Sequence, residues 1–98
     1  MEKLALDSYV MDVLMPDLVG HDHKPSAFLV YLFLLHQSRR GRHERITVSL
    51  QTIATRTGLS KSSVQSAIRH LKRRGLLDAK TQATATTPVR RIMRPWIK

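Results

Sequence analysis

Cysteine is absent from the 98-residue chain, so neither a disulfide framework nor a thiolate metal site can form. Long apolar runs are absent as well, because the longest, Ala27–Leu35, falls far short of the roughly 20 residues that span a bilayer. The N-terminus, MEKLALDSYV, lacks the basic start and the apolar stretch of a signal peptide. We therefore expect a cytoplasmic protein with no membrane partner.

Acidic residues are also scarce, and five of the seven lie within residues 1–23. No paired carboxylates and no Ser/His/Asp grouping can be argued from the sequence, so we expect no enzyme activity and no cofactor. His21 and His23 could begin a metal site, but no third or fourth ligand is evident. Histidines in a polar loop are usually solvated, and no metal site is predicted.

Charge is divided unevenly along the chain. Residues 1–23 carry one lysine and five acids, 1 − 5 = −4, whereas residues 24–98 carry 16 basic and two acidic residues, 16 − 2 = +14. A strongly basic body on a small domain indicates a polyanionic partner, and we expect nucleic acid. A basic surface that serves only solubility is the alternative. The division suggests an acidic N-terminal segment (1–23) followed by a basic domain (24–98).

The acidic N-terminal segment fits two structures. The alternation of Tyr9, Met11 and Val13 indicates a strand, whereas a wider set of apolar positions fits one face of a helix. Pro16 limits any helix that crosses it. We predict a short strand followed by a helical turn over residues 16–19, with a helix as the alternative.

Residues 25–41 are predicted to form a helix, since Pro25 suits a first turn and Gly41 suits an end. The middle of this helix is apolar on all sides, so other parts of the protein must cover more than one face. Residues 1–20 are one possible cover. A second subunit is the other, which would make a homodimer through helix 25–40 or through the N-terminal segment.

Two helices joined by a tight turn are predicted next. The first begins after Ser49, its predicted N-cap, and ends at Gly58. The second covers residues 61–74, with Ser60 as its N-cap and Gly75 just past its end. Two helices joined by a short turn that contains glycine make a helix-turn-helix.

Short strands are predicted on either side of this pair. One lies within residues 42–49, and two more, residues 76–81 and 89–94, are joined by the uncharged loop 82–88. The closing hairpin would form a wing. The predicted fold class is therefore mainly α with a small β-hairpin wing, a winged helix-turn-helix.

A helical wheel divides helix 61–74 into two faces. An apolar stripe that contains Val64, Ile68 and Leu71 should pack on the domain, and the opposite side has small hydroxyls at its start and cations further along. Such a face suits the major groove, where Gln65 can pair with adenine and Arg69 with guanine. An ordinary amphipathic surface helix is the alternative. The candidate DNA-binding residues here are Ser60, Lys61, Ser62, Ser63, Gln65, Ser66, Arg69, His70 and Arg73.

Residues 53–77, IATRTGLSKSSVQSAIRHLKRRGLL, resemble the helix-turn-helix of winged-helix DNA-binding proteins, such as small bacterial regulators of the MarR and GntR types. A wider stretch, residues 9–77, is similar to the winged-helix domain of plasmid and phage replication initiators. The resemblance implies binding to double-stranded DNA with helix 61–74 in the major groove. The positions that match are Ala54, Gly58, Leu59, Val64, Ile68 and the RRGLL that leads into the wing.

The predicted wing departs from the many winged domains whose basic tip enters the minor groove, because its tip has no charge. We expect its stems to contact phosphates through Lys80, Arg90 and Arg91, and a polar loop without DNA contact is the alternative. The function predicted from the sequence is sequence-specific DNA binding by a transcriptional regulator. The alternatives are a replication-initiator-like DNA-binding module and a winged-helix scaffold that binds protein.

Overall fold

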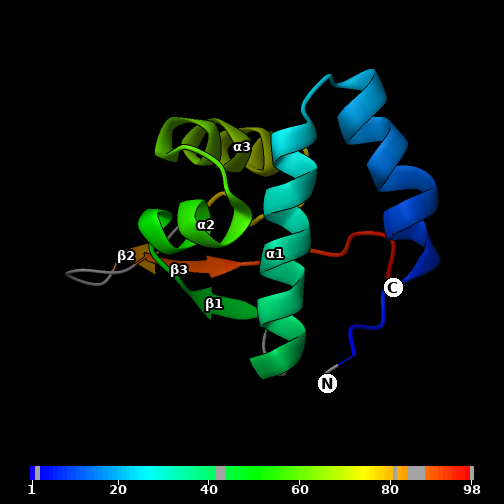
Figure 1. Ribbon diagram of the computed structural model, residues 1–98. Helices are drawn as coiled ribbons and strands as arrows, with labels where there is room; N and C mark the ends of the chain where they lie inside the picture. Colours follow the sequence, from blue (N-terminus) through cyan, green and yellow to red (C-terminus); the bar gives the residue numbers. More distant parts are fainter. Residues whose placement is uncertain (2, 42–43, 81, 84–87, 98) are drawn as a thin grey trace.

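The computed structural model describes residues 1, 3–41, 44–80, 82–83 and 88–97. Within them, three α-helices and a small antiparallel sheet form a winged helix-turn-helix, which confirms the predicted fold class (Figure 1). Most of the predicted wing tip, residues 84–87, lies outside the described residues. The elements are η1 (Val10–Leu14), η2 (Pro16–His21), α1 (Pro25–Gly41), β1 (Arg45–Thr47), α2 (Leu50–Thr57), α3 (Lys61–Arg73), β2 (Gln82–Ala83) and β3 (Pro88–Arg91).

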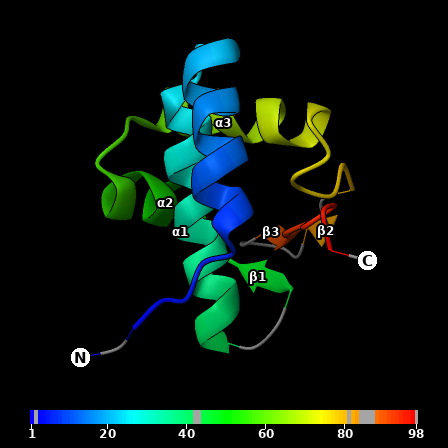
Figure 2. The ribbon, with the colours of Figure 1, turned by 90° about the vertical axis from the view of Figure 1, so that its right-hand side faces the viewer.

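Helix α1 runs through the centre of the domain, in keeping with its apolar composition. The N-terminal helix, which covers residues 8–21 and includes η1 and η2, lies on one side of α1, and α2 and α3 lie on the other (Figure 1 and Figure 2). Val30, Tyr31 and Leu34 of α1 are completely buried, while Leu32 and Phe33 are partly buried against the same core. Among the described residues, no helix has both the length and the apolar character needed to cross a membrane.

The acidic N-terminal segment is helical over residues 8–21, so the predicted strand is wrong. Val10, Leu14 and Leu18 recur at every fourth position and are buried in the core, because this helix covers the second side of α1. The residues whose alternation suggested a strand are all exposed: Tyr9, Met11 and Val13. The spacing that decides the structure is therefore that of the buried residues.

Pro16 is accommodated by wide, π-type winding. Proline has no backbone N–H and crowds the preceding turn, so an ordinary α-helix cannot pass through it unchanged. The N–H of Met15 bonds to the carbonyl of Val10, and the N–H of Asp22 bonds to the carbonyl of Asp17 at 2.8 Å. Each bond spans five residues, so the helix is widened on both sides of the proline. The same winding brings Asp17 and Asp22 to nearly the same side of the helix.

The two helices of the helix-turn-helix begin and end where their capping residues predict. Ser49 and Ser60 each accept a hydrogen bond from the backbone N–H three residues later, in both cases at 3.1 Å. Gly58 and Gly75 follow α2 and α3 with φ of 78° and 72°, in the left-handed region that favours glycine. Local chemistry therefore sets both the turn and the exit toward the wing.

The sheet has the order β1-β3-β2, with β3 antiparallel to both neighbours. The first arm of the wing differs from the prediction, because its ladder strand is β2 and not residues 76–81. The backbone N–H of Asp78 still bonds to the carbonyl of Arg91 at 2.9 Å. The Asp78 side chain then accepts a bond from the N–H of Lys80 at 3.0 Å, which turns the chain and interrupts the strand.

Trp96 joins the two ends of the described chain. Its ring stacks on Tyr9 at a centroid distance of 4.7 Å and meets the edge of Tyr31 at 6.4 Å. The indole N–H donates a hydrogen bond to a carboxylate oxygen of Asp7 at 3.2 Å. The N-terminal helix is thus held by the C-terminal residues as well as by α1.

We expect Leu18→Ala to lower the free energy of unfolding by about 2–5 kcal/mol, because Leu18 is fully buried between the N-terminal helix and α1. Val19→Ala is the matched control, since the Val19 side chain is 38% exposed and should cost less than about 1 kcal/mol. Urea unfolding followed by circular dichroism measures both. Equal losses would show that the N-terminal helix is not part of the core.

Candidate nucleic-acid interface

Helix α3 presents one polar face to solvent from a firmly packed position. Val64, Ala67, Ile68 and Leu71 are buried, and this apolar face fixes the helix on α1 and α2. The opposite face is free of apolar groups and contains three basic residues that were predicted from the sequence. The exposed residues of α3 are Lys61, Ser62, Gln65, Arg69 and Arg73.

The hydroxyl groups at the start of α3 differ in how far they are committed to the protein. Ser60 caps the helix by accepting the N–H of Ser63, and its hydroxyl donates to the hydroxyl of Ser63 at 3.0 Å. The hydroxyl of Ser62 lies 3.2 Å from the hydroxyl of Ser60, but Ser62 stays exposed. The first turn therefore has only short side chains beyond Lys61, which leaves room for an incoming ligand to approach the backbone.

One flank of α3 is occupied by the acidic N-terminal segment. The ammonium group of Lys24 donates to the hydroxyl of Ser66, and Nε2 of His70 lies 2.7 Å from Oδ2 of Asp22. Both Ser66 and His70 are only partly exposed. Of the predicted DNA-binding residues, His70 is therefore engaged with Asp22 of the N-terminal segment, and Ser66 is engaged with Lys24, which directly follows the segment.

The residue that follows α3, Arg74, binds the same segment through two carboxylates. Its guanidinium pairs with Asp17 through Nη2 and with Asp22 through Nε, the latter at 3.1 Å. We call Asp17, Asp22, His70 and Arg74 the flank cluster. The sequence indicated the acids and the bases of this cluster but not their pairing, because the partners are 48 to 57 residues apart.

Asp22 is the centre of the flank cluster. Hydrogen bonds from His21 and His70 lower the pKa of the Asp22 carboxyl, and the charge of Arg74 acts in the same direction against the opposing effect of burial. The side chain of Asp22 is 8% exposed, whereas that of His21 is 79% exposed. The ionised carboxylate is therefore the form that the fold stabilises.

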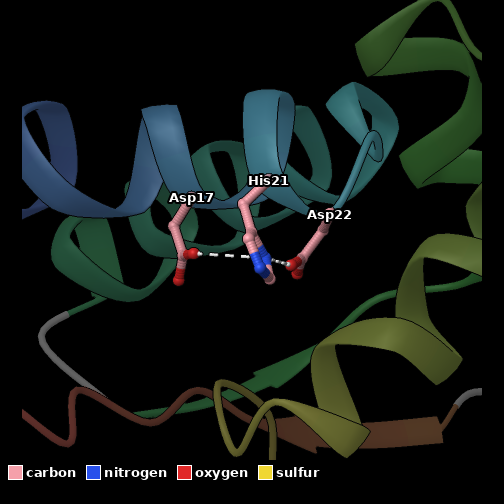
Figure 3. Close-up of side chains that lie close together, drawn as sticks. All are labelled: Asp17, His21 and Asp22. Atoms are coloured by element: carbon pink, nitrogen blue, oxygen red, sulfur yellow. Dashed lines mark hydrogen bonds and ion pairs between the residues drawn. The ribbon is translucent and has the colours of Figure 1, made fainter.

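Asp17, His21 and Asp22 place potential metal-ligand atoms within 4.8 Å of one another (Figure 3). His21 Nδ1 lies 2.8 Å from Asp22 and 3.8 Å from Asp17. His23, the other histidine considered from the sequence, does not belong to this group. Both carboxylates also pair with Arg74, so a cation of the protein already offsets part of their charge.

The stem cations of the wing differ in their access to solvent. Arg90 is only 7% exposed, burial lowers the pKa of its guanidinium, and its Nε has no hydrogen-bond partner in the described part of the chain. Arg91 is half-exposed and pairs with Glu44 at 3.2 Å, while Lys80 is exposed. Outward contacts are thus open to Lys80 and Arg91, and the structure places Arg90 inside.

One basic residue of this region was not predicted from the sequence. Arg45 of β1 is exposed and lies directly opposite Arg91 in the register of β1 and β3. Together with Asp78, Lys80 and Val89, these two arginines line an open hollow of about 210 Å³. Neighbouring strands bring the cations together, and no local sequence pattern could have shown this.

Comparison with known proteins gives one family and no individual relative. The family described as a helix-turn-helix domain matches residues 24–77, which span α1 to the end of the helix-turn-helix. Neither the curated proteins nor the solved structures include a match. The N-terminal helix and the wing lie outside the matched residues.

We expect Asp22→Asn to lower the free energy of unfolding at neutral pH by about 1–3 kcal/mol, because charge-assisted bonds to His21, His70 and Arg74 are weakened. A carboxyl whose pKa is lowered by folding contributes stability above its ordinary value of 3.8 and loses it as pH falls through the lower, folded value. The difference between wild type and variant should therefore persist to about pH 4 and then shrink in stronger acid.

Chemical denaturation across this pH range measures the difference. Asp12→Asn is the matched control, because Asp12 lies on the same helix, is exposed, and has a side chain that makes no hydrogen bond or ion pair within the described part of the chain. If the difference in the free energy of unfolding between wild type and Asp22→Asn stays constant down to strong acid, the charge of Asp22 is not the source of the stability.

Proposed function

Because the chain belongs to the helix-turn-helix domain family, we propose that it binds double-stranded DNA sequence-specifically, with α3 in the major groove, and acts as a transcriptional regulator. The observation that carries the proposal is the outer face of α3, which is exposed, polar and cationic. This face is held on a rigid core by four buried apolar residues. A helix that reads base edges needs that combination of fixed position and adaptable polar surface.

We assign base readout to the middle of α3 and phosphate contact to its ends. The chain contains no asparagine, so Gln65 is the amide on α3 that can pair bidentately with adenine N6 and N7. Arg69, one turn later, can pair with guanine O6 and N7. Lys61 and Arg73 at the two ends are suited to phosphates, as are Arg45, Lys80 and Arg91 at the wing stem.

A replication-initiator-like module would use the same interface, so the geometry of α3 does not separate it from a regulator. A protein-binding scaffold is the second candidate, and one observation favours it. The N-terminal helix exposes several apolar side chains that a protein partner could cover, among them Met11, Met15 and Val19. Dependence of binding on salt separates the two, because displacement of counterions from DNA is an electrostatic effect.

We expect the affinity for a mixed-sequence duplex to fall steeply with salt, with a slope of log K against log salt of about −0.9 per phosphate neutralised. Lys61→Ala should make the slope shallower by about one. Arg39→Ala is the control, because Arg39 is exposed in the last turn of α1, at the end away from α3 (Figure 1). Fluorescence anisotropy measures the binding, and a flat salt response would exclude DNA as the partner.

We expect Gln65→Ala to change the DNA motif selected from a random duplex pool, and Arg73→Ala to leave that motif intact. A lost base contact costs roughly 1–3 kcal/mol and relaxes preference at one position, whereas a lost phosphate contact weakens all sequences alike. Selection and sequencing with each variant measures both effects. An unchanged motif with Gln65→Ala would assign readout to other groups, such as Ser62, or to DNA shape.

A further inference from the structure

The acidic N-terminal segment lies against the interface that we assign to DNA. Its charge over residues 1–23 is 1 − 5 = −4, opposite in sign to the rest of the chain. Two of its carboxylates, those of Asp17 and Asp22, contact residues at the C-terminal end of α3. The family match covers residues 24–77, so this segment is an addition to the matched domain.

Arg74 is the residue of the flank cluster for which DNA and the segment would compete. Guanidinium groups bind carboxylates and phosphates through the same planar set of donors. Arg74 already binds Asp17 and Asp22, although its side chain is 37% exposed and follows directly on Arg73. A phosphate beside Arg73 would therefore meet a cation that two carboxylates have neutralised.

Apolar packing keeps the segment in place when the ion pairs are lost. The pair of Arg74 with Asp17 is partly exposed, and such pairs contribute about 0–1 kcal/mol, while loss of the more buried contacts of Asp22 costs about 1–3 kcal/mol. Val10, Leu14 and Leu18 are buried, and they hold the N-terminal helix on α1 whether or not Arg74 is paired. The carboxylates thus stay close to α3 at a high effective concentration, and neutralising them should leave the helix docked.

We propose that Asp17 and Asp22 act as an intramolecular substitute for DNA phosphate, so that the N-terminal segment lowers the affinity of α3 for duplex DNA. The proposal rests on the function proposed above and adds its regulation. The segment keeps Arg74 from binding the phosphate backbone of DNA. It also places negative charge within a Debye length of the bound duplex, about 10 Å at 0.1 M salt. Any event that neutralises or displaces the two carboxylates would release the withheld cation.

The test uses the full chain with Asp17→Asn and Asp22→Asn combined, measured by fluorescence anisotropy on a mixed-sequence duplex between about 50 and 200 mM salt. We expect binding about threefold to tenfold tighter than wild type at the low end, and a salt slope steeper by about 0.9 for the phosphate gained. Asp12→Asn changes the charge of the same helix by one without touching α3, and it should leave the salt slope unchanged.

Arg74→Ala makes the test specific. In the wild-type background it should not raise affinity, because Arg74 is already paired and its loss leaves the two carboxylates uncompensated. In the double-asparagine background it should abolish the gain. If the double variant fails to fold, as judged by circular dichroism, Asp17→Asn alone replaces it, since Asp17 is 34% exposed and contributes one of the two pairs.

Three outcomes overturn the proposal: no gain in affinity, an equal gain with Asp12→Asn, or a gain that survives Arg74→Ala. The last two would reduce the effect to general charge repulsion. Failure of the proposed function looks different, because neither the wild type nor any variant would then bind duplex DNA in a salt-dependent manner. Salt-dependent binding by the wild type without a gain in the variant would refute the regulation alone.

Discussion

The need to bury both sides of α1 determines how the rest of this structure is arranged. Val30, Tyr31 and Leu34 are completely buried, and a helix this apolar cannot leave a side in water. The helix-turn-helix covers one side, and the N-terminal helix covers the other. Because the helix-turn-helix and the N-terminal helix both pack on α1, they also come into contact with each other. The contact lies at the C-terminal end of α3. Hydrophobic packing on α1 thus brings the acidic N-terminal segment against the basic interface.

Local chemistry made much of the fold predictable from the sequence. Ser49 and Ser60 cap their helices and Gly58 and Gly75 end them, because each of these roles depends on a hydroxyl or a positive φ within one helical turn. The same reasoning failed at the N-terminus. The apolar residues there fit both the alternation of a strand and one face of a helix, and only the packing against α1 decides which of them are buried.

The candidate interface was predictable on α3 and less so elsewhere. The outward face of an amphipathic helix follows from its 3.6-residue period, so the exposed Lys61, Gln65 and Arg69 were expected. On the wing, Arg90 and Arg91 are adjacent on a strand and point to opposite sides, and the register with β1 determines which one is buried. Neither that register nor the pairing of Arg74 with the N-terminal segment can be predicted from neighbouring residues, because the partners are far apart in the chain.

The position of Trp96 gives the protein a natural optical reporter. It is the only tryptophan in the chain, and its indole is stacked on Tyr9 of the N-terminal segment and bonded to Asp7. Loss of that stacking would expose the ring to water and change its fluorescence, while events confined to the outer face of α3 would leave its surroundings intact. The fluorescence of Trp96 therefore distinguishes detachment of the acidic N-terminal segment from binding of a ligand to the outer face of α3.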